Sequence, residues 1–109
     1  MTDDGAIENE AEFNSLLQMC LERMDELRAT YPKRNKLEIL SDIELQLDIM
    51  RRRTADGGVP TTLERERITI AGLTKFHFPV AERKPPAHYL MSVMCDLAHA
   101  YQNWEEVPT

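Results

Sequence analysis

Apolar residues recur at steps of three and four over three stretches of the chain, which is the spacing of one face of an α-helix. The first stretch is closed by Tyr31-Pro32, because the residue before a proline is disfavoured in helical geometry. The last is opened by Pro85-Pro86, where a missing backbone amide costs the helix nothing. The three stripes consist of Phe13, Leu16, Leu17, Cys20, Leu21, Met24 and Leu27; of Leu40, Ile43, Leu47 and Met50; and of Leu90, Val93, Met94, Leu97, Tyr101 and Trp104.

The second helix, expected from Leu37 to Arg53, has a broad apolar surface. Ile39, Leu45 and Ile49 extend it beyond the stripe. A helix with so wide an apolar face is either central in a bundle or also contacts a partner. The same face offers a surface for formation of a homodimer.

Between the second and last helices the pattern is less regular. Residues 55–58, Ala-Asp-Gly-Gly, form a break. Thr61 and Glu64 have the spacing of a capping box, in which each side chain binds a free backbone amide at a helix start. The pattern predicts a helix from Leu63 to Thr74, although the β-branched residues 68–70 also fit a strand.

Phe76, Phe78 and Val80 alternate with polar residues or proline. This alternation predicts an extended piece or a loop whose apolar side chains pack inward. With short connections throughout, the whole pattern predicts an all-α fold, a four-helix antiparallel bundle over residues 11–109. Residues 1–10 carry four carboxylates and almost no apolar side chain, so we expect a flexible, disordered acidic arm.

Composition narrows the function classes. The 109 residues carry a net charge of −6 and suffice for one domain with little room for a deep substrate cleft. The acidic balance argues against binding to nucleic acid or to an anionic membrane. The N-terminus lacks the basic and apolar regions of a signal peptide, so we expect a cytoplasmic protein.

Candidate chemistry is sparse, and we expect neither enzyme activity nor a metal or cofactor. Cys20 and Cys95 form no Cys-x-x-Cys pair. His88 and His99 lie about three helical turns apart, too far for one metal ion to bridge. Cys95 and His99 are an i, i+4 pair, but nothing nearby supplies an oxyanion hole.

Charged residues gather on the second helix. Glu38 and Asp42 lie one turn apart, as do Glu44 and Asp48. Like charges at this spacing destabilise a helix slightly, and either a basic partner or arginines of this chain would offset that cost. The run Arg51–Arg53 is placed to interact with the negative end of the helix dipole.

Four segments stand in order along the chain: Tyr31-Pro32; Glu44-Leu45-Gln46-Leu47; Arg67-Ile68-Thr69-Ile70-Ala71-Gly72-Leu73 with Phe76 and Phe78; and the proline-opened last helix with Ala100-Tyr101. Together they resemble small helical immunity proteins of type VI secretion systems, those that neutralise effectors with NAD(P)-hydrolysing activity. The resemblance covers roughly residues 16–104. The sequence differs from the family pattern in a more basic, proline-rich segment 77–86 and in the acidic arm, which points to a different cognate toxin.

The resemblance implies that the protein binds the toxin domain of an effector and blocks its nucleotide cleft. Because such a cleft is basic, the acidic residues are the candidate contacts. They are Glu38, Asp42, Glu44 and Asp48, followed by Glu8 and Glu10. The alternative is a small helical regulator or adaptor that contacts DNA through residues 51–53, Arg65 and Arg67.

Overall fold

A computed structural model describes residues 7–107 of the chain. Most of the predicted acidic arm, residues 1–6, lies outside the described residues. Glu10, the last residue of the predicted arm, is the first residue of α1 (Glu10–Glu22). Asn9 caps this helix, with its side-chain oxygen accepting a hydrogen bond from the backbone amide of Glu12 at 2.8 Å.

Within the described residues, the prediction of an all-helical fold is confirmed, but the count of four helices is not matched. Two of the expected helices are each divided in two, and two short 3₁₀ helices are added. The helices are α1 (Glu10–Glu22), α2 (Met24–Thr30), α3 (Arg34–Thr54), α4 (Thr62–Glu66), α5 (Ile70–His77), η1 (Val80–Glu82), α6 (Pro85–Gln102) and η2 (Trp104–Glu106).

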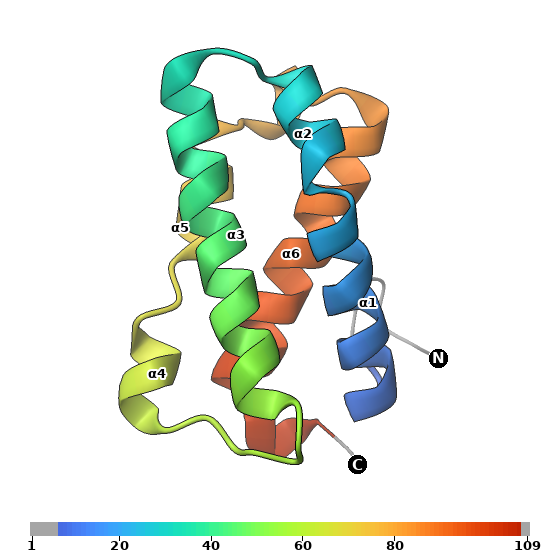
Figure 1. Cartoon of the computed structure of the whole chain (residues 1–109), viewed down its shortest axis with the longest axis vertical. Coiled ribbons are helices and arrows are strands. Elements are labelled where there is room, and N and C mark those ends of the chain that lie inside the picture. The colour runs from blue at the N-terminus through green and yellow to red at the C-terminus, as the bar shows by residue number, and fades with distance from the viewer. Residues whose placement is uncertain (1–6, 108–109) are drawn as a thin grey trace.

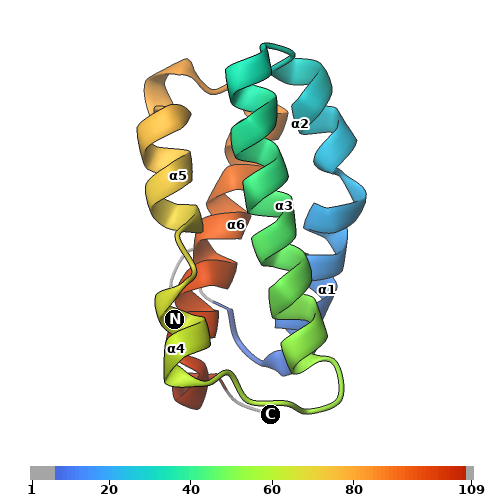
Figure 2. The same ribbon diagram turned by 60° about the vertical axis from the view of Figure 1, so that its left-hand side comes forward.

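The helices run alternately up and down (Figure 1). The chain rises through α1 and α2, descends through α3, rises through α4 and α5, and descends through α6. Figure 2 shows α3 between α5 on one side and α1 with α2 on the other, with α6 behind. One long face of α3 is therefore turned away from the rest of the molecule.

The core is formed by the three predicted stripes. All the predicted stripe residues of α3 and of the last helix are buried, and Tyr101 is the largest of the fully buried side chains. In the first stripe, only Leu16 and Leu21 remain partly exposed. The helical period of the apolar residues therefore identified most of the buried surface of these elements.

The predicted helix from Leu63 to Thr74 is interrupted between α4 and α5. Ile68 and Ile70 are both buried. On a continuous helix, residues two positions apart are rotated by about 200° around the axis and lie on nearly opposite sides, so one of the two isoleucines would face solvent. Breaking the helix lets both side chains enter the core, and no strand forms here.

Two glutamines replace the backbone hydrogen bonds lost at this break. The amide of Gln102 on α6 donates to the carbonyl oxygens of Arg65 at 3.3 Å and Ile68 at 3.1 Å. The side-chain oxygen of Gln46 on α3 accepts from the amide of Thr69 at 2.8 Å. These contacts fix the start of α5 against both neighbouring helices.

The prediction for residues 76–80 is wrong for two of its three apolar side chains. Phe76 belongs to α5 and is 80 % exposed, and Val80 on η1 is also largely exposed. Only Phe78 packs inward, edge-on against Tyr31 with ring centroids 4.9 Å apart. Because α5 continues to His77, the side chains follow the helical period and not the expected alternation.

The predicted helix boundaries at proline and glycine are confirmed. α2 ends before Tyr31-Pro32, and Pro85 occupies the first turn of α6. Beyond α3, Gly57 has φ of +76°, a conformation that L side chains rarely adopt. The chain can therefore turn sharply there toward α4.

Candidate functional site

The position of α5 beside α3 is set by contacts at both of its ends. At its start, the Gln46 amide nitrogen donates to Thr69 Oγ1 at 2.9 Å. At its end, the Lys36 ammonium donates to the carbonyl oxygen of His77. The two helices thus run antiparallel, with the Thr69 side of α5 turned toward α3.

The last carbonyl groups of α5 are bound by cationic side chains. Besides Lys36, Arg83 donates to the carbonyl oxygens of Phe78 at 2.6 Å and of Thr74 at 3.4 Å. The Lys36 ammonium also lies 5.0 Å from the centroid of the Phe78 ring. Positive charge at a helix C-terminus is favourable, so this end of α5 is held firmly in place.

Phe76 is presented next to α3 by this arrangement. It lies near the end of α5, one residue before His77, whose carbonyl oxygen binds Lys36 of α3, and its side chain is 80 % exposed. On α3, a stripe at i, i+4, i+7 and i+11 combines two carboxylates with two exposed apolar side chains. We call this surface the α3–α5 face; it consists of Glu38, Asp42, Leu45, Ile49 and Phe76.

Among the predicted acidic contacts, two are neutralised within the chain. Glu44 pairs with Arg28 of α2. Asp48 pairs with Arg51 at 2.6 Å and with Arg52 at 2.7 Å. These carboxylates already have arginine partners, so their charge is less available to another protein.

Glu38 and Asp42 are both exposed. Glu38 approaches Arg34 at 3.6 Å, but both side chains are largely exposed, and such pairs contribute little. Asp42 accepts one hydrogen bond from the Gln46 amide at 3.2 Å. The structure therefore places these two predicted residues on the same side of α3 as the exposed Leu45 and Ile49, and α5, which carries the exposed Phe76, packs beside α3.

Glu8 and Glu10 do not belong to the α3–α5 face. The backbone amide of Glu8 donates to the carboxylate of Glu12 at 2.6 Å, and Glu10 lies in the first turn of α1. A carboxylate at this end of a helix interacts favourably with the helix dipole. Their local role is thus to stabilise the start of α1.

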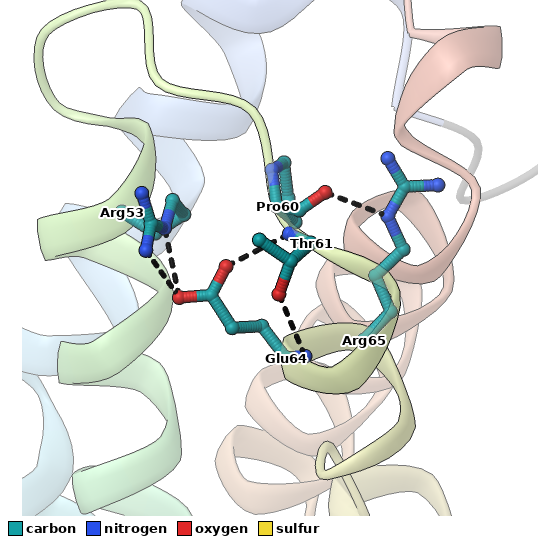
Figure 3. Close-up of polar contacts among 5 residues, drawn as sticks. All are labelled: Arg53, Pro60, Thr61, Glu64 and Arg65. Atoms are coloured by element: carbon teal, nitrogen blue, oxygen red, sulfur yellow. Dashed lines mark hydrogen bonds and ion pairs between the residues drawn. The ribbon is translucent and has the colours of Figure 1, made fainter.

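A polar cluster between α3 and α4 lies beyond Ile49, at one end of the α3–α5 face (Figure 3). The predicted capping box is present, with Thr61 Oγ1 accepting from the Glu64 amide and Glu64 accepting from the Thr61 amide. Arg53 also donates to Glu64, at 2.6 and 2.8 Å. These hydrogen bonds lower the pKa of the Glu64 carboxyl, and the one from the Thr61 backbone amide has the largest effect. Ile49 and Arg52 line a shallow hollow above this cluster, together with Arg53 and Glu64.

Arg65, named in the DNA-binding alternative, is also occupied. It donates to the carbonyl oxygen of Pro60 at 3.2 Å and to Glu105 at 2.6 Å. The hydrogen bond from Arg65 lowers the pKa of the Glu105 carboxyl from its usual 4.5 to about 2. The pair joins α4 to η2 and withdraws the arginine from the surface.

A small cavity of about 180 Å³ lies at the other end of the bundle. Its walls come from the end of α2, the start of α3 and the segment after α5; they include Tyr31, Lys33, Lys36 and Phe78. The Tyr31–Phe78 ring pair and the Lys36 contact stabilise these walls. The cavity is large enough for one small side chain.

Cys20, Cys95, His88 and His99 lie on α1 and α6, outside the α3–α5 face, whereas the ring of His77 lies 5.0 Å from that of Phe76 on α5. Burial raises the pKa of the Cys20 thiol to about 12, which keeps it protonated at neutral pH. Cys95 lies 3.1 Å from Thr74 Oγ1. His88 and His99 are exposed, and residues 7–107 contain no group of three or more metal-ligating side chains of the His, Cys, Asp and Glu types.

Replacing Gln46 by leucine (Gln46→Leu) is expected to lower the free energy of unfolding by about 1–2 kcal/mol. Leucine keeps the buried volume but removes the acceptor of the Thr69 amide and the donor to Thr69 Oγ1. Urea denaturation measures the loss. Gln18→Leu is the control, because the Gln18 amide on α1 is exposed and should change stability by less than about 0.5 kcal/mol. Equal stability of the two variants would contradict a structural role for Gln46.

Sequence reasoning missed the exposure of Phe76, which is the most exposed large apolar side chain among the described residues. Its spacing from Ile70 and Thr74, the buried residues of α5, carried the signal, because the helical period places Phe76 away from both. No helix within residues 7–107 is long and apolar enough to span a membrane. Comparisons with models of known families, with curated proteins and with solved structures gave no match.

Proposed function

We propose that this protein is an immunity protein that binds and inhibits the toxin domain of a type VI secretion effector. It would do so by covering a nucleotide cleft of the NAD(P) type with the α3–α5 face. The sequence resemblance supplies the class of partner, and the surface chemistry of α3 and α5 supports the mode of binding.

The observation that carries the proposal is the combination of exposed apolar side chains with the two exposed carboxylates of Glu38 and Asp42. Phe76 is 80 % and Leu45 58 % exposed. Glu38 and Asp42 are exposed on α3, about two turns and one turn before Leu45. Apolar anchors surrounded by charged side chains are typical of protein-binding surfaces, in which a few buried residues supply most of the affinity.

Charge complementarity favours a basic partner. A cleft that holds the phosphates of NAD(P) is positively charged, whereas this protein has a net charge of −6. Opposite charges accelerate encounter and orient the two proteins. The arginines required by the DNA-binding alternative are largely engaged with Asp48, Glu64 and Glu105, which makes that alternative less favourable.

The test mixes this protein with the purified toxin domain encoded beside its gene and follows the loss of NAD(P). Inhibition complete at a one-to-one ratio supports the proposal. A toxin that consumes NAD(P) unhindered rejects it. A toxin that binds this protein but leaves NAD(P) intact would retain the immunity role with another toxic chemistry.

The double substitution Glu38→Lys/Asp42→Lys is expected to slow association with the toxin at least about tenfold at low salt. The effect should shrink as salt is added, because exposed charges are screened. Stopped-flow or surface-based kinetics measures it. Glu22→Lys/Glu106→Lys makes the same change in net charge with exposed carboxylates of α1 and η2. An equal slowing by this control would show that net charge matters and the α3–α5 face does not.

A further inference from the structure

The outward side of α3 has a charge pattern that is complementary to itself. Glu38, Leu45 and Arg52 follow one another at intervals of seven residues, so they lie along one line of the helix. The side chains of Glu38 and Arg52 are 69 % and 71 % exposed, and Leu45 is 58 % exposed. An apolar residue therefore lies midway between opposite charges.

We infer that two copies of this protein associate through antiparallel pairing of α3, with a two-fold axis at Leu45. In this arrangement Leu45 contacts Leu45 of the second copy. Glu38 meets Arg52 of the second copy, and the same pair forms again on the other side of the axis. The polarity of the pattern selects the antiparallel orientation, because parallel helices would place like charges together.

The neighbouring charges are compatible with this pairing. Asp42 and Asp48 lie about 60° to either side of Leu45, on opposite flanks, so Asp42 does not meet Asp48 of the second copy at the same level. The two copies of Asp42 share a flank but are offset by about 9 Å along the helix axis. Arg52 now binds Asp48 at 2.7 Å. When Arg52 turns toward the second copy, Asp48 keeps Arg51 at 2.6 Å and is not left unpaired.

The dimer covers part of the α3–α5 face. Self-association and toxin binding therefore exclude each other, a consequence that rests on the proposed function, whereas the dimer itself does not. The contact is small, with exposed apolar anchors and surface ion pairs, so it dissociates on dilution. A tight partner would readily displace the second copy.

Sedimentation equilibrium of the full chain tests the inference without any toxin. The average mass of the wild-type protein should rise with concentration from 12.6 kDa toward twice that value. Glu38→Arg and Arg52→Glu should each weaken self-association at least about tenfold, since like charges then face each other. An equal mixture of the two variants should associate again, because each reversed charge meets an opposite charge on the other variant. Arg67→Glu, at an exposed residue off α3, is the control and should behave as wild type.

Three results would overturn the inference. The first is a wild-type mass that stays at that of one chain over the whole concentration range. The second is a reversed variant that associates as strongly as the wild type. The third is a mixture that remains monomeric while circular dichroism shows that both variants are folded. None of these results depends on the identity of the toxin, so failure of the dimer leaves the proposed immunity function to its own test.

Discussion

Replacing Phe13 by alanine (Phe13→Ala) is expected to lower the free energy of unfolding by about 3–5 kcal/mol. The Phe13 ring is fully buried and packs edge-on against Trp104, with centroids 4.9 Å apart and an interplanar angle of 76°. The substitution removes this aromatic pair and leaves a cavity between α1 and η2. Urea denaturation followed by the fluorescence of Trp104, the only tryptophan, measures the loss.

The matched control is Phe76→Ala, which removes the same ring from the surface of α5. Because the Phe76 side chain is 80 % exposed, its loss should change stability by less than about 0.5 kcal/mol. If Phe13→Ala lowered stability as little as Phe76→Ala, the packing of Phe13 on Trp104 of η2 would not stabilise the fold. The contrast separates a residue that maintains the fold from one that is available to a partner.

The long helices could be predicted because each must bury one stripe of apolar side chains at the helical period. Leu40, Ile43, Leu47 and Met50 illustrate this, since all four are fully buried. Proline, glycine and the capping box then marked several of the ends. These features depend on local stereochemistry and on the spacing of residues close together in the chain, so they can be predicted from the sequence.

The break between α4 and α5 could not be predicted in the same way. Its hydrogen bonds come from Gln46 and Gln102, on helices that are distant in sequence from residues 67–69. Ile68-Thr69-Ile70 fitted both a strand and a helix. Long-range side-chain contacts decided the outcome, together with the burial of both isoleucines.

The candidate site shows the same division. The spacing of Glu38, Asp42, Glu44 and Asp48 predicted an acidic helix surface. Which of these charges stay available depends on partners elsewhere, such as Arg28, which is sixteen residues before Glu44. The exposure of Phe76 likewise depends on the length of α5 and on its packing against α3.

Under the proposed function, Phe76→Ala is expected to weaken binding of the toxin domain about 30- to 150-fold, which corresponds to about 2–3 kcal/mol. The exposed ring can enter an apolar pocket of the partner without rearrangement of the fold, because Lys36 and Arg83 hold the end of α5 in place. An aromatic side chain offers a large buried area at a low cost in conformational entropy. Isothermal titration calorimetry of the folded variant measures the change.

Tyr89→Ala is the control that tests whether the location of the aromatic ring matters. Tyr89 is 50 % exposed on α6, in a shallow hollow lined also by Arg83, Pro85 and His88, away from the α3–α5 face. Its removal should leave toxin binding within about twofold of the wild type. If Tyr89→Ala weakens binding and Phe76→Ala does not, the toxin contacts α6, and the carboxylates of α3 then lose their proposed role. If both variants bind like the wild type, neither exposed ring is an anchor, and affinity must come from Leu45, Ile49 and the charges around them.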